Sequence, residues 1–199
     1  MPRPILATID LAALRHNLAR AREAARGRFV WAVVKANAYG HGLARALRAF
    51  ADADGLALLD LDEAARARQA GWRKPILLLE GCFEASDLAA CADLGLTTVV
   101  HCGEQLEMLE HHRPSRPLSV HLKLNTGMNR LGFRPQAAVQ AYERLRGLHS
   151  VRELTLMMHF ANADRPVGAT GPVPGAEQLE EVDGVPAGWP APRPRANSA

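Results

Sequence analysis

Residues 29–42 read FVWAVVKANAYGHG, and this stretch contains the unit from which the fold is predicted. The continuous apolar run 29–34 is typical of a β-strand that is buried on both faces, as in parallel sheets. A glycine-containing turn at 37–42 follows it, and a helix is expected from about 43 to 53. The stretch therefore predicts a strand, a turn and a helix in succession, with Lys35 at the end of the strand.

The same unit recurs along the chain. Further strands are expected at 5–9, 55–59, 75–79, 97–100, 118–124 and 154–159, and further helices at 11–25, 61–70, 86–94, 103–111 and 134–146. Asp10 and Asp60 are in position to cap the first two of those helices. Strands that alternate with helices through short connections indicate a parallel α/β architecture. Because no dinucleotide-binding glycine fingerprint follows the first strand, a (β/α)8 barrel of the TIM type is favoured over a doubly wound sheet.

The composition is that of a soluble globular protein and argues against several classes of function. The 199 residues are 48% hydrophobic and 23% charged, enough for one domain or a domain and a half. The formal charge of +3 comes with scattered arginines and no interleaved aromatics, which argues against nucleic-acid binding. No apolar run suits a signal peptide or a membrane span. Because Cys82, Cys91 and Cys102 follow no metal-ligand spacing, we expect no metal and interpret them as reduced thiols of a cytoplasmic protein.

Lysine is scarce in this chain. Lys35, Lys74 and Lys123 are the three lysines, and the other 21 basic residues are arginines, which stay charged and cannot serve as amine nucleophiles. Lys35, Lys123 and His159 each lie at the end of an apolar strand, where barrels gather their functional groups. Partial burial of Lys35 would favour its neutral amine, the form that Schiff-base chemistry needs. Position alone favours the alternative that Lys35 is inert and pairs with a carboxylate.

Two longer motifs change this balance. The string 34–42, VKANAYGHG, resembles the cofactor-lysine signature of the alanine racemase family, which are pyridoxal-phosphate enzymes of fold type III. The resemblance implies that Lys35 is the catalytic lysine that holds pyridoxal 5'-phosphate and that Tyr39 binds the cofactor. The string 121–132, HLKLNTGMNRLG, resembles the family's second signature. There Lys123 matches a lysine that is often carbamylated, and Arg130 matches an arginine that contacts both cofactor and substrate.

Two shorter matches follow in the same order as in the family. His159, within 158–161, matches the histidine that packs against the pyridine ring of the cofactor. Asn197 and Ser198, within 195–199, match the segment that binds the cofactor phosphate. One departure is Asn125, where the family usually has aspartate. We interpret the remaining histidines, including His111 and His112, as surface residues.

The resemblance implies an isomerase that interconverts L-alanine and D-alanine, supplies D-alanine for the cell wall, and works as a cytoplasmic homodimer. A complete barrel needs about 250 residues. Without the segment 5–9, we count barrel strands that end near 34, 59, 79, 100, 124 and 159 and a last one near Ala196, which makes seven of eight. Glycines and prolines interrupt a helix that begins at 178–183. The family's second, β-rich domain carries the tyrosine that acts as the opposite base. We therefore expect residues 1–199 to be a truncated N-terminal barrel domain with little or no racemase activity.

Two alternatives stay open. The chain could be a barrel protein that binds pyridoxal phosphate without turnover, which its length favours. It could also belong to a racemase of another amino acid on the same scaffold.

Overall fold

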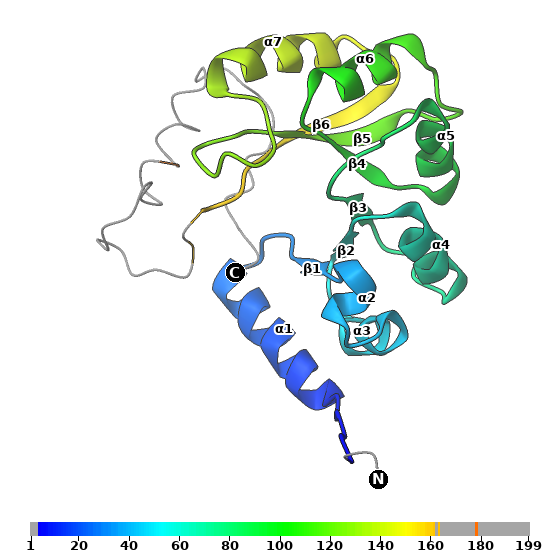
Figure 1. Ribbon diagram of the computed structural model, residues 1–199, viewed down its shortest axis with the longest axis vertical. Helices are drawn as coiled ribbons and strands as arrows, with labels where there is room; N and C mark the ends of the chain where they lie inside the picture. Colours follow the sequence, from blue (N-terminus) through cyan, green and yellow to red (C-terminus); the bar gives the residue numbers. More distant parts are fainter. Residues whose placement is uncertain (1–3, 162, 164–177, 179–199) are drawn as a thin grey trace. The chain divides into compact units, whose positions relative to one another are not determined.

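The computed structural model describes residues 4–161, 163 and 178, and in these it contains six strands and seven helices (Figure 1). The chain divides into two compact units, residues 1–77 and 78–199, which we describe separately. The elements up to β3 are α1 (Leu11–Ala25), β1 (Trp31–Val33), α2 (Lys35–Tyr39), α3 (Leu43–Ala49), β2 (Gly55–Leu58), α4 (Leu61–Gln69) and β3 (Ile76–Leu78). The later ones are α5 (Ala85–Leu94), β4 (Thr97–Val100), α6 (Gly103–His111), β5 (Leu118–Lys123), α7 (Pro135–Arg146) and β6 (Val151–Met157).

The strands follow one another in the sheet in the order of the sequence, from β1 to β6. Three pairings, β1 with β2, β4 with β5 and β5 with β6, are parallel along their whole recorded register. Sequential parallel strands joined by helices are the arrangement expected of a (β/α) barrel. The predicted alternation of strands and helices is therefore confirmed for the described residues.

The central strands β2 and β3 are apolar and buried on both faces. All four residues of β2 and all three of β3 are buried, with Leu56, Leu58 and Ile76 fully inaccessible to solvent. In the second unit, α7 turns Ala138, Ala141, Tyr142 and Leu145 inward and packs on β5, β6 and α6 (Figure 1). This leaves the strand ends as the places where polar side chains are tolerated.

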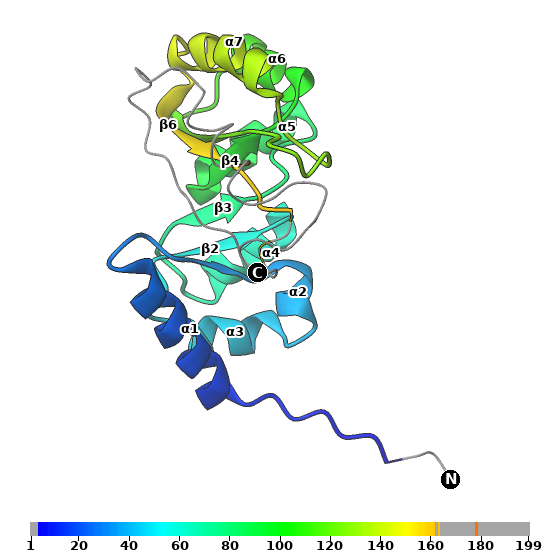
Figure 2. The same cartoon turned by 90° about the vertical axis from the view of Figure 1, so that its left-hand side faces the viewer.

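Several predicted bounds are wrong. Residues 5–9 are not a strand: Figure 2 shows irregular chain before α1, and this segment has no ladder partner among the described residues. Ile5 and Leu6 are 88% exposed. The helix expected at 43–53 ends at Ala49, because a run of turns leads into β2. The last described strand runs from Val151 to Met157 rather than from 154 to 159, since its ladder with β5 begins at Val151. The expected strand near Ala196 lies outside the described residues.

The histidine prediction is wrong in two places. His101 and His121 are half-buried, whereas His16, His41, His111, His112 and His149 are exposed as expected. Both exceptions lie in or directly after strands, where apolar neighbours exclude water. The three cysteines are free thiols, in agreement with the sequence. Within the described part of the chain, no helix has both the length and the apolar character to cross a membrane.

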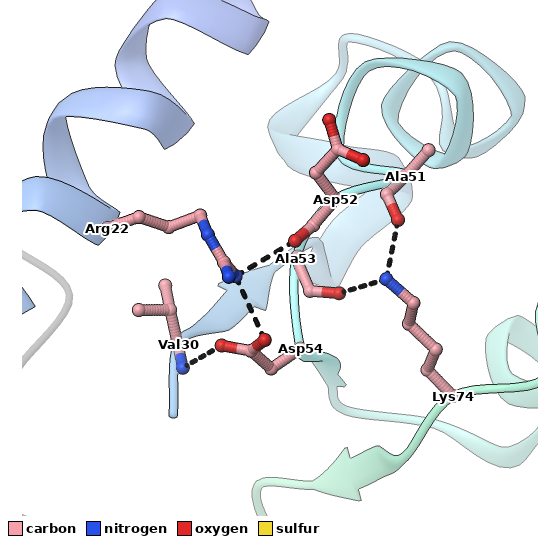
Figure 3. Close-up of polar contacts among 7 residues, drawn as sticks. All are labelled: Arg22, Val30, Ala51, Asp52, Ala53, Asp54 and Lys74. Atoms are coloured by element: carbon pink, nitrogen blue, oxygen red, sulfur yellow. Dashed lines mark hydrogen bonds and ion pairs between the residues drawn. The ribbon is translucent and has the colours of Figure 1, made fainter. Parts of the chain in front are cut away.

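Polar contacts fasten the first unit around the loop before β2 (Figure 3). The Asp54 carboxylate accepts hydrogen bonds from the Arg22 guanidinium at 2.9 Å and from the Val30 N–H at 2.8 Å, which ties α1 to the start of β1. Burial raises the pKa of Asp54, but these two donors outweigh it and the net pKa is lowered. Lys74 Nζ donates to the carbonyls of Ala51 and Ala53 at 2.7 and 2.8 Å. This loop therefore holds one of the three lysines in a structural role.

His121 makes the stability of the fold depend on pH. Burial lowers the pKa of His121 from 6.5 to about 4, so the folded chain keeps the ring neutral where the unfolded chain binds a proton. This contribution to stability is complete above pH 6.5 and is lost as the pH falls toward 4, by about 1.4 kcal/mol per pH unit. We expect the melting temperature of His121→Gln to fall less between pH 6.5 and 4.5 than that of the parent chain. His149→Gln, at an exposed position, is the control, and an equally small fall in that variant would contradict the assignment.

Candidate active site

The turn after β1 has an unusual backbone. Ala36, Asn37, Ala38 and Tyr39 all have φ between 52° and 55°, which makes α2 a left-handed turn built from four non-glycine residues. Each L-residue in this region costs about 1–2 kcal/mol relative to a right-handed turn. Gly40 and Gly42, in the glycine-containing turn expected from the sequence, also have positive φ. The residues with positive φ therefore begin at Ala36, directly after Lys35.

Hydrogen bonds hold this turn in place. The Asn37 side chain accepts from Leu43 N at 2.8 Å, and the Gly42 N–H donates to the Asn37 carbonyl at 2.9 Å. From α4, the Glu63 carboxylate accepts the Asn37 N–H at 2.5 Å. Asn37 is therefore bonded through its amide, its carbonyl and its side chain.

The three lysines have different surroundings. Lys35 is half-buried, its Nζ lies 5.8 Å from the centre of the Tyr39 ring, and no described residue gives that amine a hydrogen bond. Lys74 is held by two carbonyls, and Lys123 is 6% exposed at the end of β5. The structure thus places the Lys35 amine near the Tyr39 ring. Among the described residues, no carboxylate forms an ion pair with Lys35.

In the second unit, the loop after β5 is organised by Asn125. Its side-chain oxygen accepts the N–H groups of Gly127 and Asn129, and its amide donates to the Asn129 side chain at 3.1 Å. An aspartate could make the first two contacts but could not donate the third. Asn125 therefore makes a contact in this loop that an aspartate could not make. Arg130, which follows Lys123 in the same loop, is exposed.

His159 follows β6 and is held through its backbone by Gln178. The Gln178 amide donates to the His159 carbonyl and to the Thr126 hydroxyl, both at 3.1 Å, and its oxygen accepts the Ala161 N–H at 2.9 Å. Gln178 is completely buried. No sequence signal marked this residue beyond its place at the start of an expected helix. The predicted phosphate-binding residues Asn197 and Ser198 lie outside the described residues.

His101, at the end of β4, is a rim residue that the sequence analysis missed. The β4–β5 register pairs Val100 with Leu122, so His101 comes next in line beside Lys123. Its Nε2 donates to the Glu80 carbonyl at 3.0 Å. Burial lowers the pKa of His101, and the nearby charge of Lys123 lowers it further. The only available signal was its position directly after an apolar strand.

Gln105 on α6 fixes the backbone around His101. Its oxygen accepts the His101 N–H at 2.9 Å, and its amide donates to the carbonyls of Glu80 and Cys82 at 2.7 and 3.1 Å. Gly81 is packed against the same amide: a Cβ there would lie 2.5 Å from Gln105 Nε2 and 2.1 Å from the Val99 carbonyl oxygen. The loop after β3 and the end of β4 are therefore one hydrogen-bonded assembly in the second unit.

Comparison with known proteins identifies the fold that carries these residues. Residues 9–198 match the family described as the N-terminal domain of alanine racemase. The chain belongs to the alanine racemase N-terminal domain family. It is 57% identical to an alanine racemase of Polaromonas naphthalenivorans over all 199 residues, which are 53% of that relative. It is 54% identical to one of Janthinobacterium over the same length, 55% of the relative.

Solved alanine racemase structures resemble this chain closely. The biosynthetic enzyme of Pseudomonas aeruginosa superposes with a TM-score of 0.85 at 46% identity, covering 92% of this chain and 51% of that one. The Acinetobacter baumannii enzyme gives 0.79 at 32% identity, covering 89% and 49%. The predicted family and barrel-type fold are thereby confirmed. The chain spans about half the length of the alanine racemases that it matches.

The hydrogen bonds of Gln105 can be tested for their contribution to the stability of the second unit. Replacing Gln105 by leucine keeps the volume but leaves the Cys82 carbonyl and the His101 N–H without this partner. We expect a loss of about 3 kcal/mol in the free energy of unfolding, measured with denaturant. Glu107→Leu, at an exposed position of the same helix, is the control. If both variants lose the same small amount, the assembly does not stabilise the rim.

Proposed function

We propose that this chain binds pyridoxal 5'-phosphate through Lys35 and forms the cofactor-binding half of a racemase that interconverts L-alanine and D-alanine. The observation that carries the proposal is the Lys35–Tyr39 pair on a pinned left-handed turn at the end of a buried strand. Membership of the alanine racemase family supports the same assignment. The finer expectations, a cytoplasmic homodimer that supplies D-alanine for the cell wall, belong to this proposal.

The residues fit a cofactor that carries an aldehyde and a phosphate. Of the three lysines, Lys35 has an amine that no described residue engages in a hydrogen bond, while Lys74 is held by carbonyls. The Tyr39 ring is 56% exposed, which leaves its hydroxyl accessible to a phosphate. Lys35 and Tyr39 would hold the cofactor. By their matches to the family motifs, Arg130, His159, Asn197 and Ser198 would contact it as well.

The chemistry assigned to these residues is proton transfer at the α-carbon of an amino acid. When bound, the cofactor withdraws electrons from that carbon and so makes its proton removable. Lys35 would take or return the proton on one face, and racemisation needs a second acid–base group on the other face. We assign the second group to the β-rich domain of the family. Arg130 would bind the substrate carboxylate through paired hydrogen bonds, the geometry that guanidinium groups favour.

Lys123 has a separate part in this proposal. A lysine that is 6% exposed is poorly solvated as an ammonium ion. Carbamylation would make it an anion, and a carbamate can orient a guanidinium such as that of Arg130. Asn125, which stands where the family usually has aspartate, organises the loop between these two residues.

Reductive labelling tests the assignment of Lys35. We expect pyridoxal phosphate followed by borohydride to modify Lys35, located by peptide mass analysis, because no described residue engages its amine in a hydrogen bond, whereas Lys74 is held by two carbonyls. Lys35→Arg should abolish the label, and Lys74→Arg should leave it unchanged. A principal label on Lys74 or Lys123 would contradict the assignment.

The same loaded chain separates the racemase from a binding protein without turnover. Exchange of the α-proton of D-alanine with solvent deuterium reports one-sided chemistry, and formation of D-alanine from L-alanine reports both sides. We expect exchange with little or no racemisation, because Lys35 serves one face. Racemisation by a chain in which Lys35 is replaced by arginine would overturn the proposed role.

Arg130 gives an independent test of substrate recognition. Because Arg130 is exposed in a loop, Arg130→Ala should weaken binding of an alanine analogue at least tenfold and shift the melting temperature by less than about 2 °C. Arg113→Ala, at another exposed position of the second unit, is the matched control. Unchanged binding together with a large loss of stability would assign Arg130 to the fold instead.

A further inference from the structure

Glu63 on α4 is an acidic residue in an unfavourable place. It is only 3% exposed, one carboxylate oxygen accepts the Asn37 N–H, and the other is buried without a hydrogen-bond partner among the described residues. Within the same part of the chain, it pairs with Arg66 at 3.7 Å, and the Arg66 side chain is 56% exposed. Charged carboxylates are disfavoured inside proteins unless they are paired or fully hydrogen-bonded. The Glu63 side chain does not cap α4, because Asp60 accepts the Glu63 N–H and is the N-cap of that helix.

The group that Glu63 contacts is the strained turn. Asn37 is the second of four consecutive non-glycine residues with positive φ, and its N–H donates to the carboxylate. L-residues return to the right-handed region unless neighbouring groups hold them away from it. A charged acceptor binds an amide more strongly than a neutral one does. The Glu63 carboxylate comes from outside residues 34–43 and accepts the Asn37 N–H. This contact therefore holds the turn in its left-handed form.

We propose that Glu63 is a positioning residue for the cofactor lysine, because its buried carboxylate holds Ala36–Tyr39 in the left-handed turn that presents Lys35 beside Tyr39. This inference rests on the proposed function of Lys35 for its consequence but not for its geometry. Glu63 touches neither reacting atoms nor cofactor in this role. It acts through the Asn37 amide, and the turn fixes the direction in which the Lys35 side chain leaves the strand.

The first experiment measures the turn without cofactor. Hydrogen–deuterium exchange of the 199-residue chain should be at least tenfold faster over residues 36–40 in Glu63→Ala than in the parent chain. Glu63→Gln keeps an acceptor of the same shape and should fall between the two. Asp62→Ala removes an exposed carboxylate from the same helix turn and is the control. Unchanged exchange of residues 36–40 in Glu63→Ala would overturn the proposal.

The second experiment tests whether Glu63 acts by offsetting the backbone strain of the left-handed turn. Ala36 has φ of 53° and an exposed side chain, so Ala36→Gly relieves backbone strain and removes only a methyl group. In Glu63→Ala, the dissociation constant for pyridoxal phosphate, followed by absorbance, should rise at least tenfold. Adding Ala36→Gly should recover most of that loss, although it restores no contact. A double variant as weak as Glu63→Ala would reject the mechanism.

The two arms separate this inference from the proposed function. If the parent chain shows no label on Lys35 but Glu63→Ala still accelerates exchange over residues 36–40, the proposed function fails and the structural role of Glu63 stands. If Lys35 is labelled equally in the parent chain and in Glu63→Ala, and exchange is unchanged, Glu63 has no positioning role and the proposed function stands.

Discussion

Strands buried on both faces are the constraint on which the rest of this structure depends. An apolar interior accepts no unpaired charge, so ionisable side chains are displaced to the points where strands end. Lys35 after β1, His101 after β4 and His159 after β6 occupy such points, and Lys123 is the final residue of β5. His121 lies within β5 instead, and burial lowers its pKa accordingly, whereas Arg152 and Glu153 within β6 are exposed. The same constraint that stabilises the sheet therefore concentrates the reactive groups.

Three of these strand ends are held by side chains from further along the chain. In the first unit, α4 reaches the turn after Lys35 through Glu63. In the second unit, Gln105 on α6 fixes the backbone around His101, and Gln178 fixes the backbone after β6. These supporting side chains are buried amides and one buried carboxylate. They form hydrogen bonds with backbone groups at the strand ends, so these side chains stabilise the fold while they position the residues there.

The order of strands and helices could be predicted from the sequence because it depends on local patterns of apolar and polar residues. Apolar runs, the caps Asp10 and Asp60 and the breaks between them depend only on neighbouring residues. The segment 5–9 was predicted wrongly because its apolar pattern is typical of a strand. A segment forms a strand only when it pairs with another one, and no described strand pairs with residues 5–9. His101 was missed for a related reason: its significance comes from the β4–β5 register, which places it beside Lys123.

The sequence by itself determined the family, the strand–helix order and the lysine expected to react, since the strings 34–42 and 121–132 are specific and lysines are few. Only the tertiary structure decided that the turn after Lys35 is left-handed in four non-glycine residues, and that Glu63, 26 residues further on, supplies its acceptor. The reason is physical. Local preference opposes positive φ for L-residues, so such a turn is selected by contacts between distant segments. Those contacts exist only after the chain has folded.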